Sequence, residues 1–347
     1  MRETELTRFW VKGLLPVRKQ DGHKGDFGKL LVIGGSVGYT GAPYLAASAA
    51  EHSGCGLVYL GVPESIWAIE AAKCAGAMPF PLPEAEGRLC LASLDAMHDK
   101  LAGCDVIALG PGLGRGKETE RLVHALLWQA RQPMVLDADG LNALQGCPER
   151  LDDRRGRATI LTPHDGEFAR LSGRTLEELS SKDRAAYACE FAQKHGCCVV
   201  LKGHRTLIAL PDGTLYRNTT GSSALSKGGS GDALTGLIAS FLCQGAGAAE
   251  AAALGVWLHG RAGELLEEEM TAYCASPLEL IERGLPRAFR EFCRKEKGID
   301  RWRRSRENLS RRRRLCWPSA TATGWTTASA RAFRSCWIAR SPHAGGS

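Results

Sequence analysis

One glycine-rich turn has residue types and spacing that suit phosphate chemistry. Residues 226–232 read Ser-Lys-Gly-Gly-Ser-Gly-Asp and run directly into an apolar segment. Gly228, Gly229 and Gly231 let the backbone approach an anion, and the following helix would add the free N–H groups and positive dipole of its first turn. Asp232 could cap that helix or take a proton from a hydroxyl held beside a phosphate. Two interpretations therefore stand, a capped helix and a catalytic anion site.

A second glycine-rich loop follows the first expected strand, at residues 34–41. This strand–loop–helix order suits a nucleotide, but the glycine spacing departs from the dinucleotide fingerprint. The next expected strand, residues 57–61, also lacks an acidic residue at its end. We therefore expect a substrate to approach this loop, and we do not expect a Rossmann-type site.

The chain alternates expected strands with expected helices, around a proline-rich segment at 79–90 that we interpret as a loop. Apolar runs predict strands at 29–33, 57–61, 106–109, 134–136, 159–161 and 197–201, and a hairpin at 207–210 and 215–218. Helices are expected at 42–53, 64–74, 93–101, 117–130, 182–195, 248–268 and 277–293, besides the one that follows Asp232. This order predicts an α/β fold with a largely parallel central sheet and helices on both faces.

Polar residues gather directly after the expected strands. The segments in question are 110–114, 137–142, 162–167 and 202–206. In an open parallel sheet the carboxyl ends of the strands share one edge, and ligands bind there. We therefore expect these segments and the turn at 226–232 to form one site. Within the expected helix 248–268, His259 is interpreted as structural or at the margin of that site, and Trp257 as a core residue.

The composition is that of an ordinary globular protein, with 44% hydrophobic and 24% charged residues among 347. No apolar run reaches the roughly 20 residues of a membrane span, and the charged N-terminus lacks the apolar core of a signal peptide. We therefore expect a cytoplasmic protein. Thirteen scattered cysteines form no CxxC pair, which favours reduced core residues over a zinc site.

The net charge of +7 arises from the last fifty residues. Residues 298–347 hold eleven arginines against Asp300 and Glu307, a charge of +9 that leaves −2 for residues 1–297. The body of the chain gives no sign of nucleic-acid affinity. The tail uses arginine to the exclusion of lysine, with four of the eight tryptophans, and we interpret it as disordered or not native to a domain spanning 1–297. An RNA-binding or membrane-surface extension is the alternative.

Residues 24–293 closely resemble the ADP/ATP-dependent NAD(P)H-hydrate dehydratases, repair enzymes with a ribokinase-like fold. Six motifs occur in the order found in that family, at 34–42, 110–114, 137–142, 162–167, 201–206 and 228–232. One departure precedes the last motif, where the chain has Ser-Ser-Ala-Leu at 222–225 and the family often has an Asn-Pro-Gly-Met-like run. It affects only the expected shape of that loop.

The resemblance implies dehydration of the S-form of NADH or NADPH hydrated at C6 of the nicotinamide ring, at the expense of ADP or ATP. Hydroxide leaves poorly, so the ring hydroxyl is phosphorylated first and phosphate is then eliminated. Asp232 would be the general base. The N–H groups of Gly229, Ser230 and Gly231 would stabilise charge on the transferring phosphoryl group.

The resemblance also implies ligands for the other residues at this edge. The nucleotide would be held by Lys202, Gly203, His204, Arg205, Thr206 and Gly231. The hydrated cofactor would be held by Ala42, Gly112, Gly114, His164 and Asp232, with Asp137, Asp139 and Asn142 toward its ribose or pyrophosphate. For Lys202 a surface role at a strand end is the alternative, and for the Asp137 group helix capping is an equal one. Glu167 would organise Mg²⁺ through water, while phosphates and water supply most ligands.

About 25 residues precede the first motif, so the chain resembles stand-alone dehydratases, and an epimerase for the same damaged cofactor would be a separate polypeptide. The stand-alone forms favour ADP over ATP, and the family suggests a homotetramer. One rival function is a ribokinase-like kinase of a vitamin precursor or sugar, which would release a stable phosphorylated product. The other is a non-catalytic nucleotide sensor, against which the intact Asp232 argues.

Truncation tests the interpretation of the tail. A chain ending near residue 296 should retain full activity and stability, because the expected domain closes before that point. Turnover and thermal unfolding of the truncated and full-length chains provide the comparison, and a loss of either on truncation would contradict the interpretation.

Overall fold

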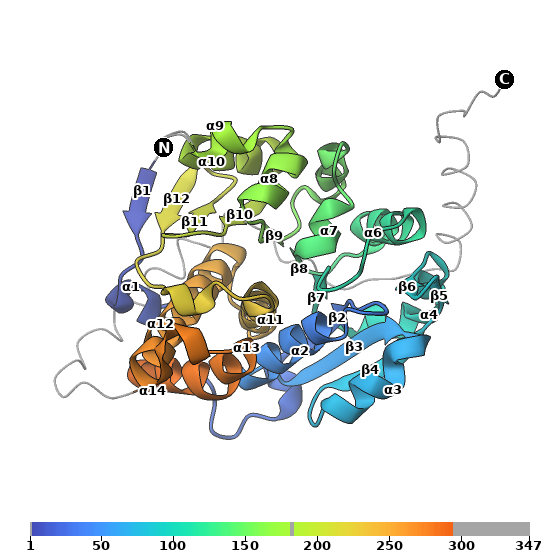
Figure 1. Cartoon of the computed structure of the whole chain (residues 1–347), viewed down its shortest axis with the longest axis horizontal. Coiled ribbons are helices and arrows are strands. Elements are labelled where there is room, and N and C mark those ends of the chain that lie inside the picture. Colours follow the sequence, from blue (N-terminus) through green and yellow to red (C-terminus); the bar gives the residue numbers. More distant parts are fainter. Residues whose placement is uncertain (1, 181–183, 294–347) are drawn as a thin grey trace. The chain divides into compact units, whose positions relative to one another are not determined.

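The computed structural model describes residues 2–180 and 184–293. They form an α/β fold in which a ten-stranded sheet has helices on both faces, as expected (Figure 1). The sheet strands are β1 (Arg2–Glu5), β2 (Lys29–Ile33), β3 (Leu57–Pro63), β4 (Met78–Leu82), β7 (Val106–Leu109), β8 (Met134–Leu136), β9 (Thr159–Leu161), β10 (Cys198–Leu201), β11 (Leu207–Ala209) and β12 (Thr214–Arg217). A separate hairpin comprises β5 (Glu84–Ala85) and β6 (Arg88–Leu89).

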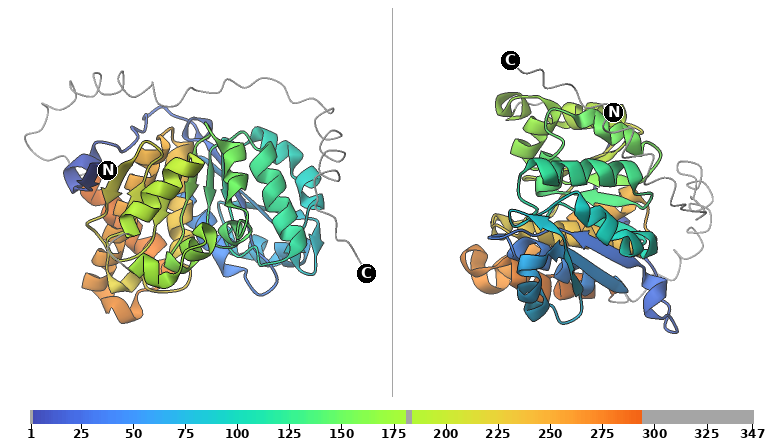
Figure 2. Two further views of the ribbon diagram at one scale, coloured as in Figure 1. Left: turned by 90° about the horizontal axis from the view of Figure 1, so that it is seen from above. Right: turned by 90° about the vertical axis from the view of Figure 1, so that its right-hand side faces the viewer.

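The helices lie in two layers. They are α1 (Arg8–Lys12), α2 (Gly41–His52), α3 (Glu64–Lys73), α4 (Ala92–Ala96), α5 (His98–Gly103), α6 (Lys117–Gln129), α7 (Ala138–Asn142), α8 (Asp165–Ser172), α9 (Leu176–Ser180), α10 (Arg184–His195), α11 (Ser230–Cys243), α12 (Ala248–Cys274), α13 (Pro277–Glu279) and α14 (Leu285–Cys293), with 3₁₀ turns η1 (Lys24–Phe27), η2 (Pro148–Arg154) and η3 (Ser223–Leu225) and a π turn η4 (Leu280–Gly284). Helices α2, α11 and α12 cover one face of the sheet, and α6, α8 and α10 cover the other (Figures 1 and 2). Every helix within the described ranges is too short or too polar to cross a bilayer.

The strand order places a topological switch in the middle of the sheet. That order is β1-β12-β11-β10-β9-β8-β7-β2-β3-β4. All pairs from β10 to β4 are parallel, and the β11–β12 hairpin adds an antiparallel end that β1 extends. The chain runs from β2 outward through β3 and β4, then returns to place β7 on the other side of β2. The loops after β2 and β7 therefore start side by side, and the chain leaves them toward opposite ends of the sheet. Open α/β sheets bind ligands at such a point.

Several expected elements differ from the structure. The proline-rich segment expected as a loop contains β4, in which Pro79 and Pro81 are tolerated because β4 is an edge strand with one unpaired side. The polar N-terminus contains the edge strand β1, which pattern analysis missed because the strand is short and charged. The helix expected at 93–101 breaks at Met97 into α4 and α5. The one expected at 248–268 extends beyond residue 268 and is interrupted at Thr271, whose φ of 67° and ψ of 158° are not helical. The tail at 298–347 lies outside the described residues.

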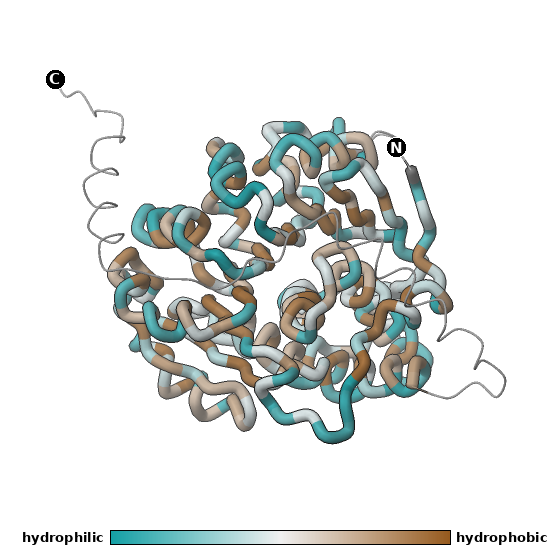
Figure 3. Tube along the Cα trace, turned by 180° about the vertical axis from the view of Figure 1, so that it is seen from behind, coloured by the Kyte–Doolittle hydropathy of each residue, from teal (hydrophilic) through white to brown (hydrophobic). Residues whose placement is uncertain are grey.

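The core is continuous on both sides of the central strands. Strands β2 and β7 to β10 are buried along almost their whole length, as expected for a parallel sheet covered on two faces. Figure 3 shows the hydropathy of each residue along the chain, with hydrophobic segments in brown. Helices α2 and α11 cross so closely that a Cβ built on Gly236 would lie 1.9 Å from the carbonyl oxygen of Ala46. Because both helices begin at glycine-rich loops, this crossing fixes the two loops relative to each other.

Gly236→Ala should destabilise the fold by about 1–3 kcal/mol or more, because the new methyl group meets backbone that cannot move alone. Chemical denaturation measures the change. Gly103→Ala is the matched control, since a Cβ at this helical glycine meets nothing within 4 Å and should leave stability unchanged or slightly raised. Equal stabilities of the two variants would refute the role of the crossing.

Candidate active site

The loops after β2 and β7 bind each other at the switch point. Gly35 N–H donates to the carbonyl of Pro111 at 2.9 Å, and the Ser36 hydroxyl donates to the carbonyl of Gly112 at 2.8 Å. Two segments about 75 residues apart in the sequence therefore form one rigid lip of the site.

Two expected substrate residues meet within that lip. Gly112 has φ +68°, and a Cβ built on it would lie 2.8 Å from the carbonyl oxygen of Tyr39 and 3.2 Å from the Cβ of Ala42. Any larger residue at Gly112 would separate the loops. Ala42 is the second residue of α2, so the first turn of that helix faces the lip.

Helix α11 begins at the glycine-rich turn. Gly229 is its N-cap, with φ +98° and ψ −19°, and makes no side-chain cap. The Nζ atom of Lys202 lies 3.2 Å from the position of a Cβ at Gly231, which places a cation against the first turn of the helix. The Ser230 N–H donates to the carbonyl of Lys227 at 3.2 Å, so it is engaged within the turn. The positive end of the helix dipole and the ammonium group together favour an anion here.

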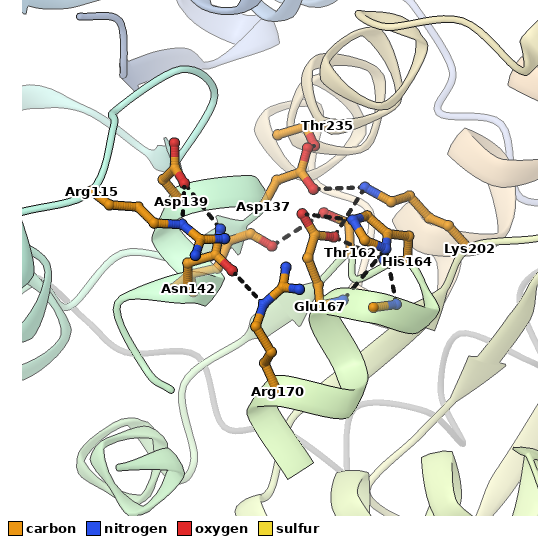
Figure 4. Close-up of polar contacts among 12 residues, drawn as sticks. Arg115, Asp137, Asp139, Asn142, Thr162, His164, Glu167, Arg170, Lys202 and Thr235 are labelled. Atoms are coloured by element: carbon orange, nitrogen blue, oxygen red, sulfur yellow. Dashed lines mark hydrogen bonds and ion pairs between the residues drawn. The ribbon is translucent and has the colours of Figure 1, made fainter. Parts of the chain in front are cut away.

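A buried ion pair holds Lys202 in this position (Figure 4). The carboxylate of Asp137, which is 1% exposed, accepts from Lys202 Nζ at 2.9 Å through one oxygen and from the Thr235 hydroxyl at 2.8 Å through the other. The carboxylate of Glu167 lies 3.8 Å from the same ammonium group. Burial alone would lower the pKa of Lys202, but the negative charges of Asp137, Glu167 and Asp232 raise it. The lysine therefore stays charged.

Both oxygens of Asp137 are thus engaged within the protein, and its side chain makes no cap to α7. The capping role expected for Asp137 is therefore wrong, while its contact with the ribose or pyrophosphate stays a prediction. Lys202 is likewise more than a surface lysine, since its side chain is only 20% exposed.

Asp232 occupies the first turn of α11, half-buried beside this cluster. Burial raises the pKa of Asp232 to about 7, the charge of Asp137 adds to the increase, and Lys202 opposes it. A carboxylate with a pKa near neutral pH suits proton abstraction, because it is both available and basic. The arrangement therefore places a proton acceptor next to an anion-binding helix terminus.

His164 and Glu167 form a capping box at the start of α8. His164 Nδ1 accepts from the N–H of Gly166 at 3.0 Å, and Glu167 accepts from the N–H of His164 at 2.8 Å. Because Nδ1 is an acceptor, the neutral ring carries its proton on Nε2, which lies 3.5 Å from the second oxygen of Glu167. The imidazole side chain remains 56% exposed and so can contact a ligand.

A second polar cluster continues along the edge on the α7 side (Figure 4). Asp139 accepts from the N–H of Gly114 and from the amide of Asn142, both at 2.9 Å. Arg170 Nε donates to the side-chain oxygen Oδ1 of Asn142 at 3.1 Å, and Arg115 Nε lies 3.6 Å from Asp139. The cluster ties the loop after β7 to the loop after β8.

The expected nucleotide segment forms the exposed turn between β10 and β11. Gly203, His204 and Arg205 are exposed, and the Thr206 hydroxyl donates to the carbonyl of Gly203 at 3.0 Å. Arg205 adopts φ +55° and pairs with Glu5 of β1. Lys202, at the start of this turn, therefore faces the site, while Arg205 is turned toward the edge of the sheet.

Sequence reasoning missed one residue that positions the site, Thr235, whereas the structure gives His259 the structural role expected for it. Thr235 was overlooked although it lies one helical turn after Asp232, a spacing that places both on one face. His259 was interpreted as structural or marginal; its Nε2 lies 2.9 Å from the carbonyl of Ser230 and 3.2 Å from its hydroxyl. Burial lowers the pKa of His259 to about 4, so the ring is neutral and steadies the first turn of α11.

The donor groups suit a magnesium ion held mainly by phosphates. Within residues 2–180 and 184–293, no three His, Cys, Asp or Glu side chains converge in a way that could hold a metal. Glu167 keeps acceptor capacity on the oxygen that faces His164. This carboxylate fits contact through water, because Mg²⁺ retains several waters when it is held by few carboxylates.

Comparisons with known proteins agree on one family. A family model described as NAD(P)H-hydrate dehydratase matches residues 30–287. The ADP-dependent (S)-NAD(P)H-hydrate dehydratase of Neisseria meningitidis is 40% identical over 253 residues, covering 72% of this chain and 81% of that protein. The bifunctional NAD(P)H-hydrate repair enzyme of Moorella thermoacetica is 45% identical over 260 residues, 75% of this chain but 49% of that protein. The chain thus spans about half the length of such bifunctional relatives.

A solved structure matches the fold as well. The ADP/ATP-dependent NAD(P)H-hydrate dehydratase from Bacillus subtilis, co-crystallised with ATP and Mg²⁺, superimposes with a TM-score of 0.69 at 34% identity, covering 82% of this chain and 97% of that one. The sheet order, the glycine-rich start of α11 and the match over residues 30–287 lead to one conclusion: the chain belongs to the NAD(P)H-hydrate dehydratase family.

Proposed function

We propose that this protein converts the S-form of hydrated NADH or NADPH back to NADH or NADPH at the expense of ADP or ATP. The observation that carries the proposal is the pairing of Asp232, whose pKa is raised to about 7, with the start of α11. A base and an anion-binding helix terminus at one point suit phosphorylation of a hydroxyl. Family membership favours this reaction over the alternative of a ribokinase-like kinase of a vitamin precursor or sugar.

The reaction balances in two steps. Asp232 accepts the proton of the C6 hydroxyl while the hydroxyl oxygen attacks the terminal phosphorus of the nucleotide. A P–O bond to the ring oxygen forms, the P–O bond to the rest of the nucleotide breaks, and AMP or ADP leaves. The ring C–O bond then breaks as the adjacent C5 proton passes to solvent water, which restores the C5–C6 double bond and releases inorganic phosphate. Phosphate is the better leaving group, and the spent nucleotide drives the repair.

The remaining residues bind and orient. The N–H groups of Gly229, Ser230 and Gly231 stabilise the transferring phosphoryl group, and Lys202 lies against the same turn. The segment from Gly203 to Thr206 holds the nucleotide, and Gly231 contacts its phosphates. Mg²⁺ supplies charge neutralisation on the phosphates, with Glu167 contacting it through water.

The hydrated cofactor lies against the lip. Ala42, Gly112 and Gly114 allow backbone approach, and His164 offers the N–H of Nε2 as a hydrogen-bond donor. Asn142, held through Asp139, faces the ribose or pyrophosphate. The name of the Neisseria relative supports ADP as the co-substrate.

The setting of the reaction is also a proposal. The free thiols of the described cysteines support a cytoplasmic location. A homotetramer is proposed from the family resemblance. The bifunctional relatives support a functional link to an NAD(P)H-hydrate epimerase.

Asp232→Asn should abolish turnover, which here means that the rate falls by about 10²-fold or more, because general-base catalysis typically contributes about 10²–10⁴-fold. Nucleotide binding should remain nearly intact, since the amide keeps the shape of the side chain. Absorbance at 340 nm with hydrated NADH, ADP or ATP and Mg²⁺ follows turnover, and calorimetry follows nucleotide binding. Retained turnover would refute the base assignment, and a stable phosphorylated product would favour the kinase.

The pH dependence of kcat/KM should show one limb near neutrality. The active form of Asp232 is the carboxylate, so kcat/KM should rise with pH through about 7 and then level off. Asp137→Asn removes a neighbouring negative charge, lowers the pKa of Asp232 and should shift this limb to lower pH. Asp153→Asn is the control, a carboxylate with a raised pKa on η2 at the opposite, amino edge of the sheet. A limb that stays in place in Asp137→Asn would contradict the electrostatic coupling.

A further inference from the structure

A cavity of about 340 Å³ lies beside the loops after β7 and β8, between α6 and α7. Its volume falls in the lower part of the range for small-molecule sites, roughly 300–1,000 Å³. It is lined by Gly114, Arg115, Thr119, Glu120, His124, Asp139, Asn142, Ala143, Gln145 and Cys147. None of these lining residues belongs to the catalytic group of the proposed reaction.

The cavity is continuous with the proposed substrate site. Asp139 lines it and binds the N–H of Gly114, and the charge of Asp139 also contributes to the raised pKa of Asp232. One end of the cavity therefore lies within charge-interaction range of the reacting centre. Asn142 lines the same end.

The lining suits a nucleotide more than an apolar group. The carboxylates of Asp139 and Glu120 can accept hydrogen bonds from ribose hydroxyls, as acidic residues do in dinucleotide sites. Arg115, 60% exposed and 3.6 Å from Asp139, is placed to reach a phosphate. His124 donates to the carbonyl of Ala143 at 2.8 Å, which fixes its ring as part of the cavity wall.

We propose that this cavity holds the adenosine monophosphate half of the hydrated dinucleotide. The inference rests on the proposed function, which places the nicotinamide ring at Asp232 and the co-substrate on the β10–β11 side. The other half of the dinucleotide then extends away from the β10–β11 turn, along Gly114 and Asp139, into the cavity that both residues line.

The test compares two substrates in variants of the cavity. Hydrated NADH carries the adenosine monophosphate half, and hydrated reduced nicotinamide mononucleotide lacks it. Glu120→Trp fills the cavity from α6, and Arg115→Ala removes its cation. Lys117→Trp, on the same helix but outside the lining, is the matched control.

Both cavity variants should raise KM for hydrated NADH by about tenfold and leave kcat nearly unchanged. A loss of affinity of about tenfold is expected when one charge-assisted contact is removed. KM for the mononucleotide and for ADP should stay at the wild-type value, as should all constants of the control. Thermal unfolding checks that each variant folds. If Glu120→Trp does not fold, Arg115→Ala alone tests the proposal.

Three outcomes would overturn the proposal. Unchanged KM for hydrated NADH means that the cavity is not used. An equal rise for both substrates means that the variants damage the lip, and a rise in KM for ADP means that the cavity holds the co-substrate.

Calorimetry with NADH and reduced nicotinamide mononucleotide separates this proposal from the proposed function. A stronger affinity for NADH that disappears in the cavity variants supports the cavity site, even if the wild-type protein turns over neither hydrated substrate. Equal affinities in the wild-type protein would overturn it.

Discussion

The buried ion pair between Lys202 and Asp137 connects the parts of the proposed site. It joins the ends of β8 and β10, and through Thr235 it reaches α11. Removing one partner would leave an uncompensated charge in the interior, which typically costs about 3–5 kcal/mol. The pair therefore does two things at once: it holds two strands and a helix in register, and it keeps a cation at the start of α11.

The same pair explains the chemistry available to Asp232. Burial is the main cause that disfavours the charged form of Asp232, the neighbouring Asp137, Glu167 and Asp139 add to it, and Lys202 limits the effect. The result is a pKa near 7, where a base is both populated and effective. His259 contributes differently, because it is neutral and holds the backbone of Ser230 instead of adding charge.

The fold positions these groups through backbone contacts. The loops after β2 and β7 meet at the switch point because Gly35 and Ser36 bind the carbonyls of Pro111 and Gly112. Helices α2 and α11 cross at Gly236 and bring their first turns to the same edge. The proposed substrate surface is thus assembled from strand ends and helix starts, with the cavity beyond Gly114 as its extension.

The sequence by itself determined the parallel α/β sheet and the edge at which the polar segments converge, because buried strands and glycine-rich loops leave strong local patterns. It did not reveal the edge strands β1 and β4, whose charges and prolines obscure those patterns. The partners of Asp137 were decided only by tertiary structure, since Lys202 and Thr235 lie 65 and 98 residues away. The pKa of Asp232 depends on burial and on charges from three other loops, and a linear sequence does not encode those distances locally.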